Sequence, residues 1–250
     1  MIIKRVAIVA TGLLAIGAIG VGIGPASAIP NRVDLANAQT TIGAIAPSIL
    51  ADTYVSSTPA LAAANSGPLV QGSPSRANTA SSISLLSMNQ QVATQVGVRI
   101  ANASGTISGS GISVIPTTDP NIFNYAQPMR NGTRFLTAFD RDARSTDFSY
   151  VFDVPAGTTA ETISGDRIAL MPPRPVDNNS PWVALGVISA PWAVDSVGAS
   201  VSTHYTWSGT TLTQYVEPTA STVFPVLADP AWNYDFYDNL QILYPAPRDE

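Results

Sequence analysis

The segment Asp147-Phe-Ser-Tyr-Val-Phe-Asp-Val-Pro-Ala-Gly157 alternates bulky apolar residues with small or polar ones. Phe148, Tyr150, Phe152 and Val154 recur at a period of two. This is the spacing that brings side chains to one face of a β-strand, so the segment predicts a strand with one buried face, over 147–153.

Similar short runs, rich in β-branched and aromatic residues, lie on both sides of this segment. Turn signals separate them roughly every ten residues, which is typical of an all-β domain. Asn131-Gly132 and Ser208-Gly209 suit tight hairpin turns. We therefore expect a single β-sandwich-like domain over 92–232. Its other strands are predicted at 96–101, 111–115, 133–139, 167–171, 182–189, 200–207, 211–215 and 223–226.

The first 28 residues have the three parts of a secretory signal peptide. Lys4 and Arg5 are followed by an apolar run, and Ala26 and Ala28 form a small-residue cleavage site. An uncleaved membrane anchor is the alternative, because the apolar run approaches the length that spans a bilayer. We expect cleavage, and hence a secreted, extracellular or envelope-associated protein with no membrane span in its mature part.

The interval 29–91 consists mainly of small residues, hydroxylated residues and proline, and Tyr54 is its one aromatic residue. Such a segment buries too little apolar surface to offset the entropy of ordering. We expect a low-complexity linker, with short helices over 42–50 and 83–92. The last segment, 233–250, is a tail rich in aromatic residues that we expect to dock on the β domain, with a short helix over 235–243.

Composition excludes several classes of function. The chain has no cysteine, which rules out disulfides and thiolate chemistry. Its net charge is −5, and its one lysine lies in the leader. An acidic chain of this kind disfavours nucleic acid and anionic membranes as partners. No phosphate-binding or dinucleotide motif is present, so no cofactor is expected. The absence of cysteine and the lysine-poor usage indicate a bacterial source.

His204 is the one histidine of the chain. Strand alternation predicts it on the same face as Ser202 and Thr206. A serine triad would need His204 beside a nucleophilic serine, and no Gly-x-Ser-x-Gly elbow supports one. A histidine held on a sheet is the simpler interpretation, and one histidine without cysteine disfavours a zinc site.

Asp140 and Asp142 are the carboxylates that could carry catalysis. Two acids across a cleft could hydrolyse a glycoside. Arg141 and Arg144 are interleaved with them, which favours an ion-paired loop instead. Calcium binding at Asp140 and Asp142, or over 177–179, is a second alternative, although neither stretch follows a known calcium-loop pattern.

The tryptophans are the remaining candidates. Trp182 and Trp207, with His204, could contact a sugar or a protein partner. The alternative is that the tryptophans fill the core of the β domain, which we favour. Trp192 and Trp232 are expected to pack, the latter within a closing segment that locks onto the sheet.

Five motifs follow one another in this half of the chain. They are the 147–157 segment, Ala190-Pro-Trp-Ala-Val-Asp195, Thr203-His-Tyr-Thr-Trp207, Thr211-Leu-Thr-Gln-Tyr215 and Phe224-Pro-Val-Leu-Ala-Asp-Pro-Ala-Trp232. Their order resembles a group of secreted actinobacterial proteins of unknown function. This chain differs from that group at two places. Phe224 stands where the group usually has tyrosine, and Ser196-Val197 stands where the group usually has Ala-Asn. The resemblance implies export and a β-rich module, without an activity.

These observations predict a non-catalytic envelope protein that binds a cell-wall glycan or an envelope protein. One alternative is a carrier domain whose C-terminal peptide is released or presented. A carboxylate-dependent hydrolase that uses Asp140 or Asp142 is the other.

Overall fold

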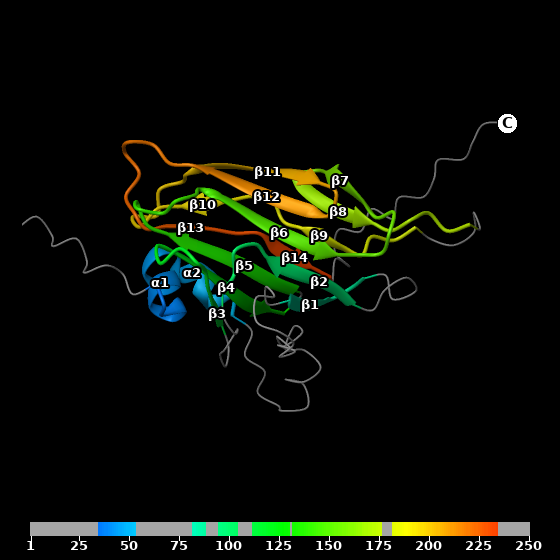
Figure 1. Ribbon diagram of the computed structural model, residues 1–250, viewed down its shortest axis with the longest axis horizontal. Coiled ribbons are helices and arrows are strands. Elements are labelled where there is room, and N and C mark those ends of the chain that lie inside the picture. The colour runs from blue at the N-terminus through cyan, green and yellow to red at the C-terminus, as the bar shows by residue number, and fades with distance from the viewer. Residues whose placement is uncertain are drawn as a thin grey trace, which may run out of the picture. The chain divides into compact units, whose positions relative to one another are not determined.

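The computed structural model describes residues 35–53, 82–88, 95–104, 112–130, 132–176 and 182–234. All of them belong to one compact unit, 33–250. Two antiparallel sheets face each other across a shared apolar core, so the predicted all-β sandwich is confirmed (Figure 1).

The smaller sheet has five strands in the order β1-β2-β6-β12-β11. The central strand β6 covers Asp147–Asp153, as its alternating sequence predicts, and its burial alternates along its length. The strands beside it are β1 (Ser82–Leu86), β2 (Gln95–Ile100), β11 (Ser202–Ser208) and β12 (Thr211–Glu217).

The larger sheet has nine strands, and β5 pairs with other strands along both of its edges. One edge of β5 pairs with β4 along its whole length. The other edge pairs first with β14 and then with β13, so the closing segment of the domain runs along it. The strands are β3 (Ser113–Pro116), β4 (Ile122–Met129), β5 (Gly132–Phe139), β7 (Thr159–Ile163), β8 (Arg167–Met171), β9 (Gly186–Ile188), β10 (Ala193–Val194), β13 (Val226–Ala228) and β14 (Ala231–Asn233).

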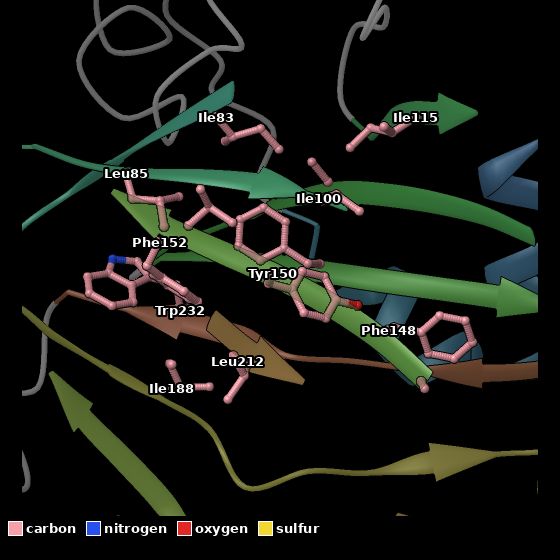
Figure 2. Close-up of a cluster of buried hydrophobic side chains, with 14 of the residues drawn as sticks. Ile83, Leu85, Ile100, Ile115, Phe148, Tyr150, Phe152, Ile188, Leu212 and Trp232 are labelled. Carbon is pink, nitrogen blue, oxygen red and sulfur yellow. The ribbon is translucent and has the colours of Figure 1, made fainter. Parts of the chain in front are cut away.

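Aromatic side chains fill the space between the sheets. Figure 2 shows Phe148, Tyr150 and Phe152 projecting from β6 into this space. Trp232 of β14 meets Phe152 from the opposite sheet, with ring centroids 5.9 Å apart. Trp232 is 1% exposed, so its expected packing role is confirmed.

Two short helices, α1 (Ala38–Ile45) and α2 (Pro47–Ala51), cover the other face of the larger sheet. The Asn37 side chain caps α1 by accepting a hydrogen bond from the amide of Thr40. Ile42 is fully buried in a cluster with residues of β4, β5 and β13. The Tyr125 hydroxyl also donates to the main-chain oxygen of Leu35, over 2.6 Å.

The linker prediction for 29–91 is therefore wrong for residues 35–53 and 82–88, which are part of the domain. Helices do form near 42–50, but the first part of the helix expected over 83–92 is instead strand β1, and residues 89–92 lie outside the described ranges. Ile83 and Leu85 alternate into the core at a period of two, which is strand and not helix spacing.

Most of the predicted strands are present, with three differences. Only Gly186–Ile188 is strand within the predicted 182–189. The strand expected over 223–226 lies at Val226–Ala228. The strands β4, β7, β10 and β14 have no counterpart among the predicted strands. The leader, the cleavage residues Ala26 and Ala28, and the helix expected over 235–243 lie outside the described residues.

Candidate functional site

The exposed face of the five-stranded sheet carries a cluster of polar and aromatic side chains from β11 and β12. His204 and Tyr215 are cross-strand partners, and their rings stack with centroids 5.0 Å apart and an interplanar angle of 11°. Beside them, the Ser202 hydroxyl donates to Oε2 of Glu217 over 2.8 Å. The other oxygen of this carboxylate, Oε1, lies 3.8 Å from Nδ1 of His204.

A row of hydroxyl groups continues this surface toward β6. Thr206 lies opposite Thr213, and Thr213 Oγ1 is 3.0 Å from Oγ of Ser149. The side chains of His204 and Glu217 are 54% and 58% exposed. We call this surface the polar sheet face, formed by Ser149, Ser202, His204, Thr206, Thr213, Tyr215 and Glu217.

The serine, histidine and carboxylate of the polar sheet face do not form a catalytic triad. A triad needs the histidine to accept the proton of the serine hydroxyl. Here the Ser202 hydroxyl donates to Glu217. The 3.8 Å between His204 and Glu217 is also too long for a hydrogen bond. The cluster therefore offers recognition chemistry: a ring stack, a carboxylate acceptor and several hydroxyl groups.

The position of His204 follows from strand alternation, as predicted. Ser202, His204 and Thr206 are exposed on one face of β11, whereas Thr203 and Tyr205 lie partly buried on the other. The sequence did not identify Tyr215 and Glu217 as neighbours of His204. The Ser208-Gly209 turn is the sequence feature that could have identified these neighbours. A hairpin at this turn sets the register of β11 on β12, and the register determines which residue of β12 lies opposite His204.

A buried polar cluster lies between the sheets, around Asp229. Oδ1 of Asp229 accepts hydrogen bonds from the amide of Trp192, over 3.2 Å, and from the Tyr205 hydroxyl, over 3.4 Å. Burial raises the pKa of this carboxyl to about 8, although the Trp192 amide and the charge of Arg134 oppose the change. Asp229 therefore holds a proton at neutral pH.

Further hydrogen bonds connect the residues around Asp229. Nε2 of Gln214 donates to the main-chain oxygen of Trp192 and to the side-chain Oγ1 of Thr203, each over 3.1 Å. Burial raises the pKa of the Tyr205 hydroxyl well above its ordinary value, and the nearby Asp229 adds to this effect. This cluster joins β11 and β12 to Trp192 and to the closing segment.

The structure places Trp182 and Trp207 away from the polar sheet face and from each other. Trp182 packs against a small apolar cluster with Met171 and Ala184, and its indole N–H donates to the Pro172 oxygen. Trp207 packs against the core, 5.5 Å from Phe152 between ring centroids. The sequence-predicted candidates Trp182, Trp207 and His204 are thus not brought together.

Asp140 and Asp142 lie in the turn after β5. The Asp140 carboxylate accepts a hydrogen bond from the amide of Arg141, and the main-chain oxygen of Asp142 accepts one from the Asn121 side chain. Arg141 lies over the ring of Phe224, 5.2 Å from its centroid, and is not paired with either acid. The other calcium candidate, 177–179, falls outside the described residues.

Within the ranges that the structure describes, no three histidine or acidic side chains gather as a metal site would require. No helix of the described ranges is long and apolar enough to cross a bilayer. Comparison of the chain with protein-family models, with characterised proteins and with solved structures finds no match. The resemblance to secreted actinobacterial proteins therefore stays a prediction.

Proposed function

We propose that this protein is an exported, non-catalytic binding module that recognises a cell-wall glycan through the polar sheet face. The observation that carries the proposal is the His204–Tyr215 ring stack beside the half-exposed carboxylate of Glu217. This combination lies on regular strands, and binding sites on strands are held more firmly than sites on loops.

The chemistry of this face suits a sugar. Sugars present C–H surfaces that pack on aromatic rings and hydroxyl groups that need hydrogen-bond partners. The carboxylate of Glu217 can accept strong hydrogen bonds from such hydroxyl groups. The hydroxyls of Thr206 and Thr213 can both donate and accept. A net charge of −5 favours a neutral or weakly charged ligand over an anionic one.

Sedimentation of the purified chain with insoluble cell-wall glycan tests the proposal. We expect Tyr215→Ala and Glu217→Gln to lower the bound fraction, and Tyr215→Phe to bind nearly as the parent does, because it keeps the ring. Glu161→Gln, on β7 in the other sheet, is the matched control. Thermal unfolding verifies that each variant is folded. Absence of glycan binding, or equal binding by all variants, would overturn the proposal.

Export is tested separately by intact mass. We expect a mass that corresponds to residues 29–250, found mainly in the cell-envelope fraction. A full-length product that stays inside the cell would contradict export and leave the binding experiment unaffected.

The closing strand favours a carrier as a second candidate function. Trp232 is held between β5 and β9, and residues 235–250 follow directly after this strand. A protease that cuts beyond Tyr234 would release the aromatic tail and leave every described residue of the domain in place. A tail that remains attached to all of the protein recovered from the medium would rule this function out.

A further inference from the structure

Strand β6 lies beside β12 in the smaller sheet and continues the surface on which His204 and Tyr215 stack (Figure 1). Tyr215 is the cross-strand partner of His204 on β11 and of Asp147 on β6. These three residues form one row across three strands, with Tyr215 in the middle. Asp147 is exposed, whereas Phe148 beside it is buried in the core. The row therefore brings a second acid, in addition to Glu217, to the surroundings of the Tyr215 ring.

The two faces of the Tyr215 ring have different neighbours. His204 covers one face, since the two rings stack at an interplanar angle of 11°. A ring that stacks on its neighbour across the strands turns its other face toward the next strand, which here is β6. Asp147 lies on that side, as the cross-strand partner of Tyr215. The open face of the ring and an exposed acid are thus neighbours on the surface of the sheet.

The charge of Asp147 is not balanced inside the described part of the chain. Its main-chain amide and oxygen both bond to the Ser145 hydroxyl, but no hydrogen bond or ion pair of the described residues reaches its carboxylate. Arg99 is the one arginine in the five strands of this sheet. Its partner is Val151, so it lies one strand beyond β6 and four residues along from Asp147. The carboxylate is therefore available to a ligand.

A tyrosine ring with carboxylates on its open side suits an ammonium group. The face of a tyrosine ring attracts a cation. Carboxylates such as those of Asp147 and Glu217 accept short, charge-assisted hydrogen bonds from it. An ammonium group brings three donors to these acceptors. The amino group of a sugar supplies such a cation next to the C–H surface that packs on the ring.

We propose that the polar sheet face, together with Asp147, recognises a glycan whose amino groups are free. This inference rests on the proposed function, of which it names the ligand class. Asp147 acts as the specificity-determining residue, because it selects amino sugars over their acetylated forms. Acetylation removes the positive charge. An acetylated sugar would then dehydrate the carboxylate without giving it a counter-charge, which disfavours its binding.

Two ligands that differ in this one group test the selection. They are oligomers of glucosamine and of N-acetylglucosamine with the same length and linkage, titrated into the purified chain in a calorimeter. At about pH 6 amino groups hold a proton and exposed carboxyl groups have lost theirs. We expect the glucosamine oligomer to bind about tenfold more tightly, and this preference to shrink as the salt concentration rises. Equal affinities, or tighter binding of the acetylated oligomer, would overturn the proposal.

A pair of variants tests the position of the charge. Asp147→Asn keeps the shape of the side chain and should lower the affinity for the glucosamine oligomer about two- to fivefold. Its affinity for the acetylated oligomer should not fall. Asp153→Asn is the matched control, because it removes the same charge from the same face at the far end of β6, opposite Gly97. The control should bind as the parent does. Equal losses in both variants would show that net charge attracts the ligand, and would overturn the role of Asp147.

Failure of this inference and failure of the proposed function give different results. Sedimentation with cell-wall glycan that depends on Tyr215, without a preference for free amino groups, would leave the proposed function in place and overturn this inference. Absence of binding to the insoluble glycan and to both oligomers would overturn both. A peptide with blocked ends and one lysine distinguishes the source of the ammonium group. Binding of this peptide as tightly as the glucosamine oligomer would overturn the assignment to a glycan.

Discussion

The hydroxyl of Tyr205 lies 3.3 Å from the main-chain oxygen of Asp229 and 3.4 Å from its Oδ1. This contact joins an edge strand of the smaller sheet to the segment that closes the larger one. Because Asp229 and Pro230 connect β13 to β14 along β5, the Asp229 carboxyl lies where the two sheets meet.

The raised pKa of Asp229 makes stability depend on pH. The unfolded carboxyl loses its proton near the ordinary value of 3.8, whereas the folded one keeps it up to about 8. Between these values unfolding releases a proton, so the stability that is complete below about pH 4 falls as the pH rises toward 8.

Asp229→Asn cannot ionise, so it should lose most of this dependence. We expect the melting temperature of the parent to fall between pH 5 and pH 8, and that of the variant to fall less. Thermal unfolding across this range, with the exposed Asp142→Asn as control, measures the difference. Equal slopes in parent and Asp229→Asn would show that the carboxyl is not protonated in the folded protein.

Asp119 has the opposite dependence. Its carboxylate accepts hydrogen bonds from the amides of Asn121 and Arg144, over 3.0 and 2.8 Å. Burial alone would raise its pKa, but these hydrogen bonds and the charge of Arg144 outweigh burial, and the pKa is lowered. The stabilisation is present above the ordinary value of 3.8 and is lost as the pH falls through the lower folded value.

Asp119→Ala removes both hydrogen bonds and should cost about 1–3 kcal/mol at neutral pH. The loss should shrink in acid, because the stabilisation from the ionised carboxylate declines once the pH falls below the ordinary value of 3.8. Chemical unfolding at pH 7 and pH 3 measures the two differences. A loss that is the same at both pH values would mean that the ionised carboxylate contributes nothing beyond its shape.

The sequence predicted the strands whose side chains alternate cleanly. Strand β6 is the clearest case, since one of its faces is buried in the core and the other is partly open to solvent. Strand β4 was missed because both of its faces are covered, one by the smaller sheet and one by the helices. Its buried residues, such as Asn124 and Gln127, therefore follow no period of two.

The candidate site was less predictable than the fold. Alternation placed His204 on the exposed face of β11, but its neighbours come from cross-strand register, which depends on the whole hairpin. Asp229 could not be identified from the sequence as a protonated buried acid. That property comes from burial between two sheets that are built from distant parts of the chain, and the hydrogen bonds from Trp192 and Tyr205 oppose it.

Gly186 provides the space for the ring of Trp232. A Cβ added at Gly186 would overlap the six-membered part of that indole. Gly186→Ala should therefore destabilise the fold by about 1–3 kcal/mol through overpacking. Trp232→Phe removes the atoms that clash, so the double variant should lose less stability than the sum of the two single changes. Additive losses in a double-mutant cycle would show that the two residues do not compete for space.

The last prediction concerns where the chain can be cut. Strand β14 lies between β5 and β9, and Trp232 carries its contact with the core. A chain that ends after Asp229 lacks this strand and the Trp232 ring, and burial of a ring of this size contributes about 3–5 kcal/mol. Because a domain is stable by only about 5–15 kcal/mol, we expect this shorter chain to lose cooperative unfolding. A chain that ends after Tyr234 keeps every described contact of β14 and should melt as the full chain does.

Calorimetry of the two truncated chains makes the comparison. If both unfold like the parent, Trp232 does not lock the domain. If the chain ending after Tyr234 also fails to fold, the tail is part of the fold and cannot be released cargo.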